Sequence, residues 1–165
     1  MTLLSRKADY ALLILSYLHQ HKEGGTARVI ADQFGLSRSF VANILKELCN
    51  KGFVASHRGV KGGYALARDP AAISLAELLE TVEDGFRLTV CNSAHNTGQA
   101  VECEHSAACT VKGPMAEVYQ RLMGVLRGVA LTELFDPKAR PSALHALPVL
   151  VGSCSAAAPV ETFPA

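Results

Sequence analysis

The sequence contains no tryptophan and few other aromatic residues, which make up 6% of its 165 residues. Since 49% of the residues are apolar, we expect a mainly aliphatic core, sufficient for one domain or one small domain with an appendage. No run of about eighteen apolar residues occurs, which argues against a membrane-spanning helix. The first residues show no signal-peptide pattern, so we expect a cytoplasmic protein without a membrane partner.

Patterns that support catalysis are also missing. The sequence shows no nucleophile–base pair, no phosphate-binding loop and no pair of acidic residues placed for acid–base chemistry, so we do not expect an enzyme. The five cysteines are odd in number and irregularly spaced. In a chain with no export signal, this usage favours ligand or sensor chemistry over a disulfide framework.

The formal net charge of +1 is unevenly distributed along the chain. Residues 1–69 contain ten Lys or Arg and five Asp or Glu, whereas residues 70–165 contain six and ten. A basic first half joined to an acidic second half suggests a polyanion-binding module attached to a part with another role.

Three helices are predicted in the first fifty residues. Ser5 begins the first helix, Thr26 begins a second over 27–34, and Ser37 begins a third. The turn 35–37 between the last two is typical of a helix-turn-helix unit. The N-terminal residues of the third helix would then face a DNA major groove. These candidate DNA contacts are Ser37, Arg38, Ser39, Phe40 and, one turn further on, Asn43.

A β-hairpin is predicted after the third helix, with strands over 53–56 and 65–67 on either side of a basic, glycine-rich turn. Arg58 and Lys61 in this turn are placed to contact phosphates or a minor groove. Helix pairs and solvated hairpins each occur in many proteins. Their order within one basic half favours a winged helix-turn-helix that binds DNA.

The second half is predicted to contain a short helix, a cysteine segment and a long helix. Ser74 and Glu77 form a capping-box pattern for the short helix, and Pro114 is expected at the first position of the long helix. The apolar residues of the long helix cover more than one face, so we expect it to pack on its own domain and on a second copy of the chain. A simple intramolecular core helix is the alternative.

The predicted fold is mainly α with a small β wing: a winged helix-turn-helix plus a long dimerisation helix. We assign 1–70 to the DNA-binding domain, 71–136 to the linker helix, cysteine segment and dimerisation helix, and 137–165 to a disordered tail.

Three cysteines stand close together in sequence. Eleven residues separate Cys91 from Cys103, and five separate Cys103 from Cys109. Zinc would require a fourth ligand such as His95 or His105, an iron–sulfur cluster accepts wide thiolate spacings, and a redox dithiol needs only a resolving partner. The spacing alone leaves all three open.

The chain resembles the bacterial IscR/NsrR family of winged-helix regulators from about Met1 to Phe135. The wing motif is the most specific part of this resemblance. The matching motifs are 9–11 (Asp-Tyr-Ala), 35–40 (Gly-Leu-Ser-Arg-Ser-Phe), 54–66 across the wing, the cysteine segment, and 130–134 (Ala-Leu-Thr-Glu-Leu).

The resemblance implies a homodimer with an iron–sulfur cluster on each subunit, held by Cys91, Cys103 and Cys109. The gap between the first two is longer than is usual in cluster-holding members. IscR-like members use a His three residues after the last cysteine, where this chain has Lys112. NsrR-like members use an Asp of the first helix, reaching across from the other subunit, and Asp9 matches that position. The plain alternative for Asp9 is an ordinary surface carboxylate.

Three thiolates and one carboxylate favour a 4Fe-4S cluster over a 2Fe-2S cluster. The sequence and the resemblance together predict an iron–sulfur-sensing transcriptional repressor that binds double-stranded operator DNA and responds to nitric oxide, redox state or iron. One alternative keeps the winged helix but uses the cysteines as a thiol switch or zinc site. Another is an iron–sulfur electron-transfer component.

Overall fold

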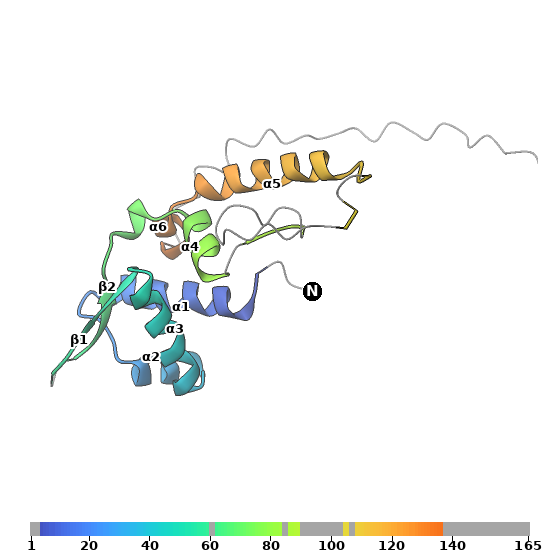
Figure 1. Ribbon diagram of the computed structural model, residues 1–165. Helices are drawn as coiled ribbons and strands as arrows, with labels where there is room; N and C mark the ends of the chain where they lie inside the picture. Colours follow the sequence, from blue (N-terminus) through green and yellow to red (C-terminus); the bar gives the residue numbers. More distant parts are fainter. Residues whose placement is uncertain (1–3, 60–61, 84–85, 90–103, 106–107, 137–165) are drawn as a thin grey trace, which may run out of the picture.

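The computed structural model describes residues 4–59, 62–83, 86–89, 104–105 and 108–136 (Figure 1). Helices dominate these residues, and the only sheet among them has two antiparallel strands. The prediction of a mainly α fold with a small β wing is confirmed. The elements are α1 (Arg6–Gln20), α2 (Ala27–Phe34), α3 (Arg38–Asn50), β1 (Val54–His57), β2 (Gly63–Leu66), the 3-10 turn η1 (Pro70–Ala72), α4 (Leu75–Val82), α5 (Lys112–Arg127) and α6 (Leu131–Phe135).

Side-chain caps begin the first two helices where the sequence predicted them. The Ser5 hydroxyl accepts the Ala8 N–H at 3.2 Å, and the Thr26 hydroxyl accepts the Val29 N–H at 3.2 Å. Each bond satisfies a backbone donor that has no partner within the helix. Gly35 ends α2 in the left-handed conformation, with φ 63° and ψ 31°, which glycine adopts without steric cost.

Ser37 occupies the predicted N-cap position of α3 but makes no capping bond. Its hydroxyl lies 2.8 Å from the hydroxyl of Ser39 instead. The start of α3 is therefore defined by the preceding Gly35 turn and by apolar packing rather than by this side chain.

The wing strands pair antiparallel from Val54 opposite Leu66 to His57 opposite Gly63. Both strands differ by one or two residues from the prediction. Phe53 is only 1% exposed and donates its N–H to the Leu48 carbonyl at 2.9 Å, so it closes α3 and the first strand begins after it. The second strand begins earlier, at Gly63, because Gly63 and Tyr64 are already part of the ladder.

A third chain segment joins the base of the wing. Gly25, between α1 and α2, donates its N–H to the Tyr64 carbonyl at 2.9 Å and accepts the Tyr64 N–H at 2.8 Å. A Cβ at the neighbouring Gly24 would lie 2.5 Å from the Tyr64 carbonyl oxygen, and Gly24 has φ +85°. This approach therefore requires glycine at position 24.

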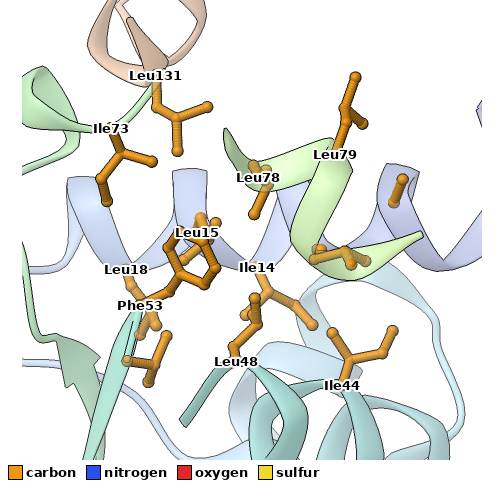
Figure 2. Close-up of a cluster of buried hydrophobic side chains, with 14 of the residues drawn as sticks. Ile14, Leu15, Leu18, Ile44, Leu48, Phe53, Ile73, Leu78, Leu79 and Leu131 are labelled. Atoms are coloured by element: carbon orange, nitrogen blue, oxygen red, sulfur yellow. The ribbon is translucent and has the colours of Figure 1, made fainter. Parts of the chain in front are cut away.

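One hydrophobic core unites both halves of the chain (Figure 2). Helix α1 crosses its centre, and side chains from α3, the wing, α4 and α6, together with Ile73 after η1, surround it. Helix α6 is attached through the backbone, since Leu131 donates its N–H to the Ile73 carbonyl at 3.0 Å and Leu75 donates to the Val129 carbonyl at 2.8 Å. The labelled core residues are Ile14, Leu15, Leu18, Ile44, Leu48, Phe53, Ile73, Leu78, Leu79 and Leu131.

The predicted capping box of α4 forms only in part. The Ser74 hydroxyl accepts the Glu77 N–H at 3.1 Å, but the Glu77 carboxylate lies 2.6 Å from Arg68 Nη1. The ion pair with Arg68 thus takes the place of the reciprocal bond.

Helix α5 begins at Lys112, so the prediction that Pro114 is its first residue is wrong. Pro114 is the third residue of α5, where proline is tolerated because the first backbone N–H groups have no partner within the helix. Helix α5 runs over α4 and extends beyond it (Figure 1). Tyr119 and Met123 are its buried residues, whereas Val118 is 49% exposed.

None of the helices within the described ranges combines the length and the apolar character that a membrane crossing requires.

Candidate nucleic-acid interface and metal ligands

The N-terminal turn of α3 presents most of the predicted DNA contacts on the surface. Ser37, Arg38, Ser39 and Asn43 are all exposed. Their placement follows from the buried stripe of α3, since Val41, Ile44, Leu45 and Leu48 face the core and turn the other side outward. Burial of the apolar face of α3 thus directs its polar residues toward the solvent.

Phe40 differs from its neighbours because it is half-buried. Its ring meets the ring of Tyr10 in α1 edge to face, with centroids 5.2 Å apart. The structure therefore gives Phe40 a packing role between α3 and α1 that the sequence reading did not identify.

An acidic residue lies among the exposed arginines of this surface. Asp32 in α2 approaches Arg38 Nη2 to 3.4 Å and Arg28 Nε to 3.8 Å. The sequence reading missed Arg28 and Asp32. Their i,i+4 spacing on a predicted helix is the signal that could have found them.

The wing contributes Arg58, which follows β1 and is exposed. The next residue, Gly59, has φ +119°, a backbone conformation that favours glycine and turns the chain. The other predicted wing contact, Lys61, lies outside the described residues.

Of the predicted metal ligands, the structure describes Asp9 and Cys109. Asp9 is exposed on α1 at the edge of a groove of about 460 Å³, which is lined by Asp9, Leu12, Leu13, Ser16, Leu134 and Phe135. Cys109 is a half-buried free cysteine just before α5. Cys91 and Cys103 fall outside the residues that the structure describes.

A carboxylate and a thiol are both suitable iron ligands. Within the described ranges, no three His, Cys, Asp or Glu side chains lie close enough together to hold a metal ion. A complete ligand set therefore needs groups beyond these residues. Cys49 is half-buried on α3 and is unlike a reactive thiol, because burial raises its pKa.

Two hydrogen bonds attach residues that precede the cysteine segment to α1 and α5. Glu83, at the end of α4, accepts the backbone N–H of Ser5 at 2.9 Å. The buried Tyr119 of α5 donates its hydroxyl to the Phe86 carbonyl at 2.9 Å. Burial and, to a smaller extent, the Glu80 carboxylate raise the pKa of Tyr119, while Arg127 opposes this shift. The start of α1 is thus tied to Glu83, and the middle of α5 to Phe86.

Comparison with known proteins adds a family match. The family model described as "Rrf2: Iron-dependent Transcriptional regulator" matches residues 4–137. The HTH-type transcriptional regulator NsrR of Geobacillus kaustophilus is 28% identical over 138 residues, which cover 82% of this chain and 91% of that protein.

Two solved structures show the same architecture. The structure described as T. potens IscR is 26% identical, has a TM-score of 0.57, and covers 79% of this chain and 84% of its own. CymR, described as the global cysteine regulator of B. subtilis, is 24% identical with a TM-score of 0.62, over 82% of this chain and 97% of its own. At that identity the likeness to CymR concerns the fold alone.

Proposed function

Because this chain belongs to the Rrf2 family of iron-dependent transcriptional regulators, we propose that it is an iron–sulfur-sensing repressor that binds operator DNA as a homodimer. Its relatives and structural neighbours are transcriptional regulators, and the expectation that it is not an enzyme is confirmed by them. The resemblance to the IscR/NsrR family is confirmed as well.

The proposed DNA-reading surface consists of the start of α3 and the wing. Its support is the exposure of Ser37, Arg38, Ser39 and Asn43 on one helix end, together with Arg58 on the wing. Hydroxyl, amide and guanidinium groups bond to base edges and phosphates. A regulator of this kind acts where the DNA is, so we place it in the cytoplasm.

The proposed cluster ligands are Cys91, Cys103, Cys109 and Asp9, with Asp9 coming from the second subunit. When bound, the cluster supplies iron that small oxidants or nitric oxide can attack. Asp9 contributes a hard oxygen donor, which suits a 4Fe-4S cluster with one exchangeable position better than a fourth thiolate would. The support is the exposed position of Asp9 at the rim of the groove and the free Cys109.

The proposed dimer surface is the apolar flank of α5, formed by Val111, Val118, Leu122 and Val125. Helical spacing puts these residues along one side, next to the buried Tyr119 and Met123. Val111 is 60% exposed and Val118 is 49% exposed. A second copy would cover this flank and place two reading surfaces on two half-sites.

The sensor would act on DNA binding through α1. Asp9 is followed directly by Tyr10, whose ring contacts Phe40 at the start of α3. Gain or loss of the bond at Asp9 would then bias the dimer between DNA-binding and non-binding arrangements.

The cluster is tested by purifying the full chain without oxygen and measuring visible absorption together with iron, sulfide and zinc. We expect coloured protein with iron and sulfide in equal amounts. Colourless protein with stoichiometric zinc would reject the cluster in favour of the zinc site. Protein that contains neither metal but forms a reversible disulfide would reject it in favour of the thiol switch.

DNA binding is tested with a duplex that the protein selects from a random-sequence pool. Affinity should fall steeply with salt, because phosphate contacts release counterions. Arg58→Ala should reduce the salt slope by about one. Arg127→Ala on α5 is the control, since that arginine pairs with Glu80 away from the reading surface. If the two variants changed the salt dependence equally, the wing would not be part of the DNA interface.

A further inference from the structure

Asp32 lies between two arginines on the surface that the proposed function assigns to DNA. One carboxylate oxygen, Oδ1, is 3.4 Å from Arg38 Nη2, and the other, Oδ2, is 3.8 Å from Arg28 Nε. A single side chain therefore contacts two arginines of the helix-turn-helix part of this surface.

The pairing follows from the geometry of the helix-turn-helix. Arg28 and Asp32 are one turn apart on α2 and share a face. Arg38 is the first residue of α3, across the tight turn made by Gly35. The carboxylate thus bridges the two helices at the point where they approach each other.

These contacts are weak sources of stability. The Arg28, Asp32 and Arg38 side chains are 73%, 57% and 59% exposed. Exposed ion pairs contribute little to folding because water and salt screen them. We therefore consider the effect of these ion pairs on DNA binding rather than on folding stability.

A negative charge here has two consequences for DNA. It opposes the attraction of any phosphate backbone, which is the part of binding that does not depend on sequence. It also holds the Arg38 guanidinium in one direction, while most of the five N–H donors of this group stay available to a base edge.

We propose that Asp32 is a specificity-determining residue: it orients Arg38, restrains Arg28, and lowers affinity for non-operator DNA more than for the operator. This inference rests on the proposed function, in which the start of α3 reads DNA. Asp32 itself is a positioning residue, since it acts through the two arginines.

The test compares the affinity for the selected duplex with that for a scrambled duplex of the same length and composition. Asp32→Asn removes the charge with little change in shape. Asp32→Glu retains the charge. Glu80→Gln is the matched control, because it also neutralises a carboxylate 3.4 Å from an arginine, but between α4 and α5.

We expect Asp32→Asn to bind the scrambled duplex about two- to fivefold more tightly, the range set by exposed ion pairs. Binding to the selected duplex should rise less, so the ratio of the two affinities falls. Asp32→Glu should restore most of the ratio, and Glu80→Gln should leave it unchanged. Thermal unfolding of each variant shows that the fold is retained.

Two results would overturn the inference. If Asp32→Asn raises both affinities by the same factor, Asp32 is only a nearby charge. If its effect matches that of Glu80→Gln, its position has no importance. Arg38→Ala separates the inference from the proposed function: loss of the ratio in that variant alone rejects the role of Asp32, whereas an unchanged ratio in that variant rejects the reading surface itself.

Discussion

The ring of Tyr10 in α1 meets the ring of Phe40 in α3 edge to face, with centroids 5.2 Å apart and planes at 87°. Tyr10 directly follows the proposed metal ligand Asp9, and Phe40 lies in the first turn of α3, next to the proposed DNA contacts. This contact therefore connects the helix of the proposed metal ligand with the helix of the proposed DNA-reading segment.

Removing this contact should weaken α1–α3 packing and, with it, operator binding. In a double-mutant cycle with Tyr10→Leu and Phe40→Leu, we expect a coupling of about 0.5–1.5 kcal/mol in urea unfolding, the value for aromatic pairs. The same cycle measured on operator affinity should also show coupling. Additive effects in both measurements would mean that the rings pack independently.

Replacing Asp9 should weaken retention of the cluster. For Asp9→Ala, we expect visible absorption to be lost at least roughly tenfold faster in the presence of an iron chelator. Substitution of a residue that only supports a metal ligand already lowers metal affinity about ten- to hundredfold. Ser16→Ala, in the same groove, is the control. Identical loss rates for the two variants would show that Asp9 is a surface carboxylate.

The two predicted caps of the helix-turn-helix should differ in their importance. Thr26→Ala removes a hydroxyl that accepts the Val29 N–H, so it should lower the free energy of unfolding by about 1 kcal/mol. Ser37→Ala removes no capping bond and should change stability by less than about 0.5 kcal/mol. Urea unfolding measures both, and a larger loss for Ser37→Ala would contradict the structure.

A charge on the apolar flank of α5 should prevent dimer formation. Val118 is 49% exposed, so Val118→Lys leaves the core intact while placing an ammonium group in the proposed interface. Gln120→Lys adds the same charge on the other side of the helix, where the surface is polar. Sedimentation should show a monomer for Val118→Lys and a dimer for Gln120→Lys. Dimers in both cases would place the interface elsewhere.

The hydroxyl of Tyr119 should stabilise the fold in a pH-dependent way. At pH 8, Tyr119→Phe should cost about 1 kcal/mol, because the bond to the Phe86 carbonyl is lost. The pKa of Tyr119 is raised in the fold, so the unfolded chain ionises first and the wild type loses stability above about pH 10. The difference between wild type and variant should therefore narrow there.

Tyr64→Phe, a half-buried tyrosine of the wing, controls for the loss of one ionisable group. Chemical unfolding at the two pH values measures both variants. A constant difference between wild type and Tyr119→Phe would contradict the raised pKa.

Local signals carried the sequence prediction of the helices. Ser5, Thr26 and Gly35 act within one turn of the chain, so their roles can be read from neighbouring residues alone. The start of α5 was missed because Pro114 is acceptable at several positions of a first turn.

Contacts between segments that are distant in sequence could not be predicted from neighbouring residues. The bonds between Gly25 and Tyr64, and the ion pair between Asp32 and Arg38, depend on how elements pack. For the same reason, Phe40 was assigned to DNA although the structure packs it on Tyr10. Cys91, Cys103 and Lys61 stay predictions, since they lie outside the described residues.

The attachment of α6 has a consequence for the order of events during synthesis. Leu131 and Phe135 are 1% and 5% exposed and pack into the core that α1 crosses. A ribosome adds about 5–20 residues per second, and domains fold as units. The DNA-binding half therefore cannot close its core until the three cysteines at 91, 103 and 109 have already left the ribosome.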